Sequence, residues 1–382
     1  MKLLIIAYNY PSRISPTRGV FVRKIVEELI KIGVEVKVIA PHVLGSFFFK
    51  SLFKFMFFRM NYSKYNESSF VFRPIVLSFG KTRIGSTYLS QYFFEKTVQR
   101  TYYKRLMNFA PDATYGHFIF PAGMTAVSLS KLLNVKSFIA IGEDNLNHLS
   151  ESIFSSYVDK ANGVISVSMK NKKKLLTLSS LESEKIIVAP NSVSADLFYP
   201  RDLNKMRAKY GFNLNDFILV FVGYFEDRKG VLRVMEALNE LEINIKIIVI
   251  GEGPQKPDIK NSRILFCDRV ENHLLPEYLS CGNVFILPTK SEGSCNAIYE
   301  AMACGLPIIS SKIPEIEEQV NSKNSLLVDP IDVFQIKNAI KQLYNDPNLV
   351  KRMSSESLRI SNSFSINDRA RVIKNFIQEN II

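Results

Sequence analysis

The chain alternates short apolar runs with longer segments in which apolar residues recur at helical spacing. In the first forty residues, 3–7 and 34–40 are apolar runs of strand length, and 20–32 carries apolar residues three and four positions apart. Gly33 follows that segment as a helix-ending glycine. This stretch predicts one β-α-β unit.

The same alternation recurs along the rest of the chain. In the first half it predicts strands at 113–115, 137–141, 163–167 and 185–189, and a helix over about 121–133. In the second half it predicts strands at 218–222, 246–251, 264–266, 284–288 and 308–310, and helices over 231–241 and 296–304. Apolar strands that alternate with helices form parallel sheets covered by helices on both faces.

The two series are separated by a polar stretch at 191–215, so we predict two doubly wound domains, 1–195 and 196–364. The last segment, about 365–382, is amphipathic and is expected to pack back on the first domain. Ligands of such sheets bind at the carboxyl ends of the strands. The cleft between the two domains is therefore the expected site.

The 382 residues fit two domains, and 47% hydrophobic with 22% charged residues is typical of a soluble globular protein. The apolar run after Lys2 is too short for a signal peptide, and no run reaches the ~18 apolar residues of a membrane span. The four cysteines form no CxxC pair, which favours a reducing cytoplasm over a disulfide framework or zinc site. No two of the four histidines are closely spaced, so no metal site is expected.

The positive charge is confined to one half of the chain. The net charge is +13, but residues 1–190 hold 26 lysines and arginines against 12 acidic residues, and the remainder has a net charge of −1. Such an excess predicts an anionic partner: a membrane surface, a phosphorylated acceptor or a nucleic acid. No recognition motif or arginine-rich helix supports nucleic acid.

Residues 46–60 break the alternation with the phenylalanine-rich sequence SFFFKSLFKFMFFRM. On a helix, Lys50 and Lys54 would share one face. We favour an interfacial helix with aromatic rings in the lipid boundary and cations on anionic headgroups. The alternative is a core or inter-domain helix with three solvated charges.

The most informative segment is 284–310, VFILPTKSEGSCNAIYEAMACGLPIIS. A strand, a polar loop and a helix follow one another, with Glu292 in the loop and Glu300 eight positions later in the helix. Gly293 lets a ligand approach the backbone, and the N–H groups of the first helical turn suit phosphate oxygens. The spacing of the two glutamates is weak evidence alone, but this wider pattern is specific.

Over nearly its whole length, the chain resembles the retaining glycosyltransferase family four, which has the GT-B fold: two facing Rossmann-like α/β domains with doubly wound parallel sheets. Besides the segment above, five blocks match in order: Pro11 to Val20 with Gly19, then HFIFPAGMTA from His117, PNSVSADLFYP from Pro190, VGYFEDRKG with Lys229, and IGEGP from Ile250. The match is weakest across about 43–110.

The resemblance implies roles for individual residues. Glu300 would hold the donor ribose, Lys229 and Arg228 would neutralise the diphosphate, and the loop at Gly19 would lie against the donor phosphates. His117 would line the reaction centre. The transferred sugar would contact Glu292 and the backbone of Gly293, Ser294, Cys295 and Asn296.

The chain departs from the family pattern at several of these blocks. Tyr224 stands where an arginine is common in the diphosphate loop, and Arg228 is the candidate to supply that charge. Ser294 and Cys295 replace a commoner Phe-Gly beside the sugar, Ser192 replaces a glycine near the domain junction, and Ile141 stands before Gly142 where a basic or aromatic residue is usual.

The expected activity is therefore transfer of a sugar from a nucleotide-diphosphate donor, with retained configuration, to a glycan or lipid-linked acceptor of the cell envelope. The sequence has no Asp-x-Asp, so no metal or other cofactor is expected. The protein would be cytoplasmic and would associate peripherally with the inner face of the membrane through residues 46–60. The alternatives are a nucleotide-sugar epimerase and a catalytically inactive GT-B scaffold or binding protein.

Overall fold

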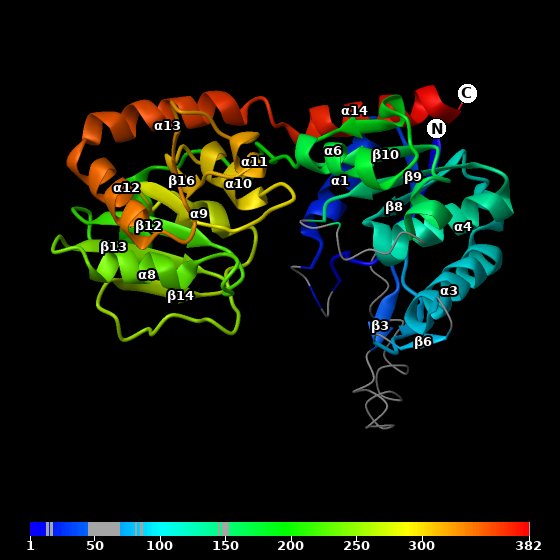
Figure 1. Cartoon of the computed structure of the whole chain (residues 1–382), viewed down its shortest axis with the longest axis horizontal. Helices are drawn as coiled ribbons and strands as arrows, with labels where there is room; N and C mark the ends of the chain where they lie inside the picture. The colour runs from blue at the N-terminus through cyan, green and yellow to red at the C-terminus, as the bar shows by residue number, and fades with distance from the viewer. Residues whose placement is uncertain are drawn as a thin grey trace. The chain divides into compact units, whose positions relative to one another are not determined.

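The computed structural model describes residues 1–12, 15, 18–44, 69–80, 82–84, 87–143, 146 and 153–381. The aromatic segment 46–60 and Asp144 lie outside these residues. The chain forms two compact units (Figure 1): the first contains Met1–Ala189 and Asn367–Ile382, and the second contains Pro190–Ile366.

The first unit is built on a seven-stranded sheet in which every neighbouring pair is parallel. In spatial order its strands are β11 (Ile186–Val188), β10 (Gly163–Ser166), β9 (Lys136–Ile141), β8 (Ala113–His117), β1 (Lys2–Ala7), β2 (Glu35–Ile39) and β4 (Val71–Phe72). Two small sheets pair β3 (His42–Leu44) with β5 (Ile75–Leu77), and β6 (Arg83–Ile84) with β7 (Thr87–Tyr88). Strand β1 is buried from Leu3 to Ala7, as a central parallel strand should be.

The helices of this unit are α1 (Val20–Lys31), α3 (Leu89–Arg105), α4 (Met124–Leu133), α6 (Met169–Leu178) and α14 (Ile366–Ile381). Helix α14 comes from the far end of the chain and packs on the sheet and α1. Lys374 donates a hydrogen bond to the carbonyl of Ile32 (2.9 Å), and the ring of Phe376 lies 5.8 Å from that of Phe138 in β9. The contacts of α14 therefore join the end of the chain to its first 190 residues.

The second unit is built on a six-stranded sheet, also parallel throughout. In spatial order its strands are β14 (Ile264–Asp268), β13 (Ile245–Ile250), β12 (Phe217–Val222), β15 (Val284–Leu287), β16 (Ile308–Ser311) and β17 (Ser325–Val328). Its helices are α7 (Leu203–Tyr210), α8 (Val231–Asn239), α9 (Leu275–Leu279), α10 (Asn296–Ala303), α11 (Pro314–Glu317), α12 (Val333–Asn345) and α13 (Pro347–Ser361). Helix α8 packs against α12, and α10 packs against α13; Figure 1 shows α13 along the top of this unit.

Seven of the helices named above lie outside the segments that the sequence pattern predicted: α3, α6, α7, α9, α11, α12 and α13. Helices α6, α7, α12 and α13 each follow a residue whose side chain accepts a hydrogen bond from the backbone N–H three residues later. These N-cap residues are Ser168, Asp202, Asp332 and Asp346. The polar stretch 191–215 is therefore more than a connection, because it contains α7 and belongs to the second unit.

Strand order fixes where a ligand can bind in each unit. In the second unit the chain adds strands outward from β12 on one side and from β15 on the other, so the order reverses between these two. In the first unit the order reverses in the same way between β1 and β8. The loops that follow the two central strands diverge to opposite faces, and the crevice between them is the usual ligand site of such a sheet.

In the second unit, two glycines allow the loops at this edge to pack closely. Gly251 and Gly253 follow β13 with φ angles of 149° and 148°. A Cβ atom on Gly251 would overlap the carbonyl oxygen of Gly223, and one on Gly253 would overlap the backbone of Phe225. The loops after β12 and β13 are therefore held backbone to backbone.

Candidate active site

The loop after β12 carries Arg228 and Lys229 to the switch point of the second unit. It ends at Gly230, which has a φ of 81° and is the N-cap of α8. Two hydrogen bonds join this loop to the loop after β15. The backbone N–H of Lys290 donates to the carbonyl of Arg228 (2.8 Å), and the Arg228 guanidinium donates to the carbonyl of Ser291 (2.8 Å). The two loops thus form one continuous surface at the carboxyl ends of β12 and β15.

The loop after β15 leads into α10, whose N-cap is Cys295. This residue makes no regular side-chain cap, and the N–H groups of a first helical turn can bind an anionic ligand. Asn296 is the first residue of the helix, and Glu300 follows one turn later at a half-buried position. The sequence-predicted residues 293–296 therefore all lie at the start of α10.

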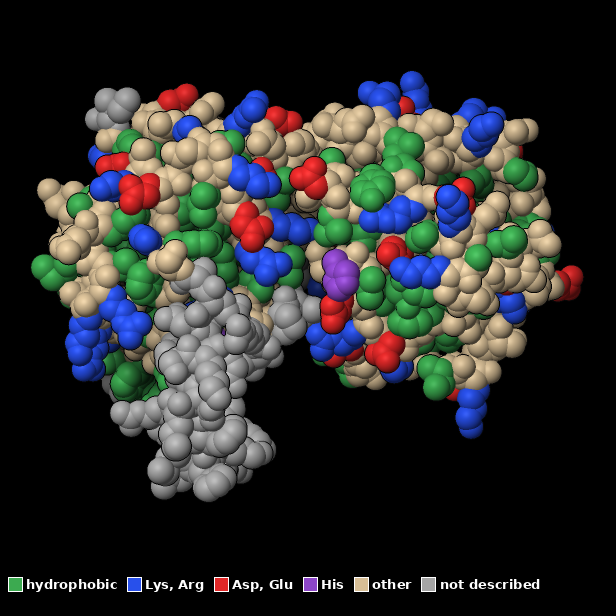
Figure 2. Space-filling view, turned by 180° about the vertical axis from the view of Figure 1, so that it is seen from behind, with side chains coloured by type: hydrophobic (Ala, Val, Ile, Leu, Met, Phe, Trp, Pro, Cys, Tyr) green, Lys and Arg blue, Asp and Glu red, His purple; other side chains and the backbone are tan. Residues whose placement is uncertain are grey.

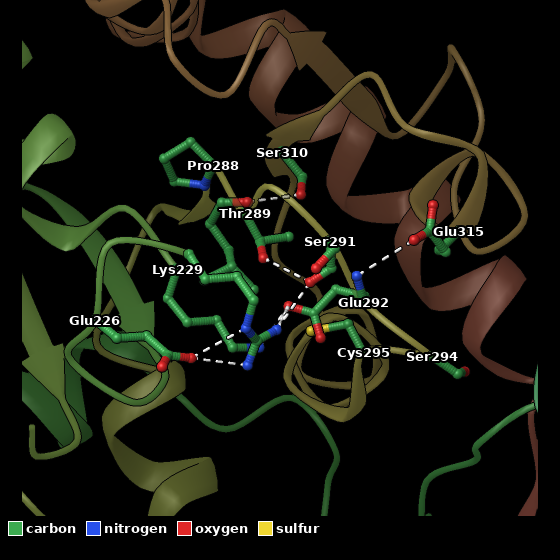
Figure 3. Close-up of polar contacts among 12 residues, drawn as sticks. Glu226, Lys229, Pro288, Thr289, Ser291, Glu292, Ser294, Cys295, Ser310 and Glu315 are labelled. Atoms are coloured by element: carbon green, nitrogen blue, oxygen red, sulfur yellow. Dashed lines mark hydrogen bonds and ion pairs between the residues drawn. The ribbon is translucent and has the colours of Figure 1, made fainter. Parts of the chain in front are cut away.

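A buried ion pair joins the two loops. Lys229 Nζ donates to Glu292 Oε1, and their side chains are only 13% and 8% exposed. Arg228 Nη1 lies 3.7 Å from the same carboxylate oxygen, and Arg228 also pairs with Glu226 at 2.8 Å. Figure 3 shows Lys229 and Glu292 pointing toward one another from their separate loops. Glu292 is thus the shared partner of both predicted diphosphate-binding cations.

Residues that the sequence did not single out hold this arrangement in place. Glu315 is 1% exposed, and its carboxylate accepts a hydrogen bond from the N–H of Glu292 (3.4 Å) (Figure 3). Gln319 is 2% exposed and bonds both the N–H and the carbonyl of Cys295, each at 3.1 Å. Both residues follow β16, so the segment after this strand fixes the backbone of the loop after β15.

A further contact comes from the start of the second unit. Asn191 donates from its backbone N–H to Ser294 Oγ (3.2 Å) and from its side chain to the Ser294 carbonyl (2.9 Å). Ser294 Oγ also lies 3.3 Å from the Tyr299 hydroxyl. Ser294, which replaces a commoner phenylalanine, therefore has a positioning role that the sequence alone could not show.

Cys295 is an inert member of the site. It is 4% exposed, and burial, followed by the nearby Glu292 carboxylate, raises the pKa of its thiol to about 12. The nucleophile of cysteine chemistry is the thiolate, which is scarce at such a pKa. Cys295 thus contributes backbone geometry and no covalent chemistry.

The switch point of the first unit brings Gly19 and His117 together. Gly19, with a φ of 71°, is the N-cap of α1, and a Cβ atom there would overlap the backbone of Asn9. His117 ends β8, and its ring lies 5.6 Å from that of Phe21 in the first turn of α1. The following residue, Phe118, has a φ of 70°, a strained value for a bulky residue. The loops after β1 and β8 therefore meet around the histidine.

His117 is neutral at physiological pH. It is 4% exposed, with Nδ1 3.2 Å from the Tyr115 hydroxyl. Burial, followed by the charge of Arg369 in α14, lowers the pKa of His117 to about 3. It can therefore exchange hydrogen bonds with a ligand, but it is too weak a base to hold a proton at neutral pH.

The sequence profile of the family described as Glycosyl transferases group 1 matches residues 216–346, which contain Lys229, Glu292 and Glu300. TuaC of Bacillus subtilis, which is named as a glycosyltransferase of teichuronic acid biosynthesis, is 26% identical over 354 residues, covering 89% of this chain and 88% of TuaC. Both comparisons identify the chain as a glycosyltransferase, and therefore as an enzyme, as the sequence predicted.

Solved structures show the same fold. Sucrose-phosphate synthase from Thermosynechococcus elongatus superposes with a TM-score of 0.78 at 17% identity, over 99% of this chain and 98% of that one. HepE from Anabaena, in complex with UDP-glucose, gives a TM-score of 0.72 at 16% identity, over 99% and 100% of the two chains. The predicted GT-B fold with two Rossmann-like domains is confirmed.

The sequence predicts that residues 46–60 bind a membrane. Residues 46–60 lie outside the described part of the chain. Among the helices that are described, none has the length and apolar character needed to cross a bilayer. The roles assigned to Glu300, His117 and the other site residues stay predictions, now with positions in the fold.

The ion pair between the loops should be measurable as a coupling energy. We expect Lys229→Met and Glu292→Gln each to lower the free energy of unfolding, because each leaves a buried charge without its main partner. The loss of unfolding free energy in the double variant should be about 1–3 kcal/mol smaller than the sum of the losses in the two single variants. Urea unfolding of the four proteins measures this. The exposed pair Lys337–Glu240 is the matched control, with an expected coupling below about 1 kcal/mol. Equal coupling for both pairs would contradict the prediction.

His117 should make stability depend on pH. Its folded pKa of about 3 lies below the ordinary value of 6.5, so below pH 6.5 the unfolded chain takes up a proton that the folded chain refuses. Stability should therefore fall as pH decreases from 6.5 toward 3, and His117→Asn should remove about 1.4 kcal/mol per pH unit from that slope. Urea unfolding at pH 7, 6 and 5 tests this, with the exposed His273→Asn as control. An unchanged slope in His117→Asn would show that the histidine is protonated in the folded state.

Proposed function

We propose that this glycosyltransferase transfers a sugar, with retained configuration and without a metal ion, from a nucleotide-diphosphate donor to a glycan or lipid-linked acceptor of the cell envelope. The second unit would bind the donor and the first unit the acceptor. HepE, which shares the fold, is described in complex with UDP-glucose, which favours a donor of this class. TuaC, which is similar over most of the chain, is named for teichuronic acid biosynthesis, which favours an envelope acceptor.

The arrangement of Lys229, Arg228 and the first turn of α10 is the observation that carries this proposal. Two cations and the N–H groups of this first turn converge on the switch point of the second unit. Each of these features stabilises negative charge, and a diphosphate needs such stabilisation both when it binds and when it leaves. Glu300, one turn into the same helix, would accept hydrogen bonds from the ribose hydroxyls.

The ion pair between Lys229 and Glu292 suggests how the site receives its donor. Without a ligand, each side chain neutralises the charge that the other would bury. When the diphosphate enters, it takes Lys229 and Arg228 as its counter-ions. Glu292 is then left to accept hydrogen bonds from the hydroxyls of the sugar. The donor thus replaces one buried ion pair by another.

The transfer step follows from these contacts. The bond between the anomeric carbon and the diphosphate oxygen breaks, and the acceptor oxygen bonds to the same face of that carbon. The acceptor proton passes to the departing phosphate oxygen, so no protein base is required and a nucleoside diphosphate is released. Lys229 and Arg228 stabilise the charge that develops on the leaving group. In this scheme the cations supply what a metal ion supplies in other enzymes.

We also propose that the enzyme works at the inner face of the cell membrane. The basic excess of residues 1–190 and the aromatic, cationic sequence at 46–60 support this. A lipid-linked acceptor would be presented at such a surface. The first unit, which holds these features, would then bring the acceptor to the enzyme.

Nucleotides should stabilise the protein against heat in the absence of metal. UDP, GDP, ADP and their sugar conjugates are tested in the presence of a chelator by thermal unfolding. Nucleotides with one of the three bases should raise the midpoint temperature of unfolding, because a ligand at 100 times its Kd stabilises the folded protein by about 2.7 kcal/mol. Lys229→Ala and Glu300→Ala should lose the shift. Lys260→Ala and Glu236→Ala, which alter exposed residues of the same unit, should keep it. No shift with any nucleotide would favour the inactive scaffold.

Vesicle binding tests the membrane proposal. The wild-type protein should co-sediment with vesicles that contain phosphatidylglycerol, and the bound fraction should fall severalfold in Phe53→Ala/Lys54→Ala/Phe57→Ala because both insertion and headgroup attraction are lost. A variant with Leu132→Ala and Met169→Ala, which removes exposed apolar side chains from the first unit, is the control. A wild-type protein that stays in the supernatant would refute the proposal.

A further inference from the structure

A small basic pocket lies in the first unit, between the last turns of α3 and the link from β4 to β5. Its volume is about 280 Å³. Its lining includes the cationic residues Arg73, Arg100, Lys104 and Arg105 and two threonines, Thr97 and Thr101. Figure 2 shows lysine and arginine side chains gathered on the side of this unit that carries α3. Four cations and two threonine hydroxyls thus surround one cavity.

Three of the four cationic residues of this pocket have no carboxylate partner within the described part of the chain. No aspartate or glutamate is among its lining residues. Arg100, Lys104 and Arg105 are exposed, and none of the three forms an ion pair with a described carboxylate. Like charges at such close quarters repel each other, and a bound anion would relieve that repulsion.

Arg73 gives the pocket a fixed, buried cation. It is 5% exposed, donates a hydrogen bond to the carbonyl of Pro11, and lies 5.5 Å from the centre of the Tyr10 ring. Burial, followed by the charge of Arg73, lowers the pKa of His42 to about 4, so this histidine is neutral at physiological pH. The guanidinium is thus positioned by the fold, whereas the other three cations can move toward a ligand.

The helix accounts for only part of this cluster. Lys104 and Arg105 lie in the last turn of α3, where cations favourably offset the negative end of the helix dipole. That effect fades within one turn, so it explains neither Arg100 nor Arg73, which comes from a different segment. The helix dipole does not explain why two segments place cations around one cavity, whereas an anionic ligand would.

We infer that this pocket binds a phosphate group. Arginine recognises phosphate through paired N–H donors, and lysine adds single donors. The volume suits a phosphate or diphosphate and is below the usual range for drug-sized ligands. The group belongs either to the headgroup of an anionic lipid or to a soluble phosphorylated compound. This site is separate from the donor site and does not depend on the transfer reaction.

The test uses the full chain with Arg100→Gln/Lys104→Gln. Lys173→Gln/Lys174→Gln, which removes two exposed charges from α6, is the matched control. Binding of inorganic phosphate and pyrophosphate is measured by calorimetry in a Lys229→Ala background, so that the donor site contributes little. Binding to phosphatidylglycerol vesicles is measured by co-sedimentation in parallel.

We expect the pocket variant to bind at least one of these probes tenfold or more weakly than the control. A loss confined to vesicles identifies a lipid headgroup, and a loss confined to the soluble anions identifies a soluble phosphorylated compound. Loss of both, with pyrophosphate competing against vesicles, identifies a pocket open to either source. Equal binding by the pocket variant and the control, or no binding of any probe by the parent protein, would overturn the inference.

Discussion

Both sheets consist of parallel strands, so each strand must be followed by a crossover that returns the chain to the same end. Where the strand order reverses, successive crossovers leave on opposite faces and cannot fill the space between them. This happens once in each unit, between β1 and β8 and between β12 and β15. Gly19 and His117 follow the first pair of strands, and Lys229 and Glu292 follow the second. The chemistry of the protein is placed by this one feature of strand order.

Charge at the second switch point is then controlled by the loops themselves. A lysine aimed at an empty anion site would be costly to bury, and so would a glutamate aimed at a sugar. Pairing Lys229 with Glu292 meets both costs before any ligand arrives. The surrounding contacts from Glu315 and Gln319 keep the loop backbone in place, so the ion pair can exchange partners without the loop refolding.

The two units differ in charge in a way that matches the division of labour we propose. The second unit is nearly neutral overall, and two of its cations, Arg228 and Lys229, lie at the switch point. The first unit spreads its cations over a broad surface, including the pocket beside α3. A donor with a diphosphate needs a few precisely placed cations, whereas an acceptor held at an anionic surface needs an extended positive field.

Much of the architecture could be predicted from the sequence, because buried parallel strands are continuous apolar runs that need no tertiary context to be recognised. The ends of β1, β9, β12 and β13 fall within one or two residues of the predicted ends. Helix α3 was missed because exposed Tyr92 and Tyr103 interrupt the apolar spacing of Phe94, Val98 and Tyr102. Helices α6, α7, α12 and α13, which start with an Asp or Ser cap, were also missed, because a cap alone is a weaker signal than apolar periodicity.

The motif around Glu292 and Glu300 and the resemblance of its neighbouring blocks were enough to predict a glycosyltransferase and its fold. Only the tertiary structure decided that Lys229 pairs with Glu292, that Glu315 and Gln319 hold the loop, and that Arg73 meets the cations of α3. The sequence gives the type of each side chain but not its burial or its distant partners. Those depend on which strands become neighbours, and that is settled only when the whole sheet is formed.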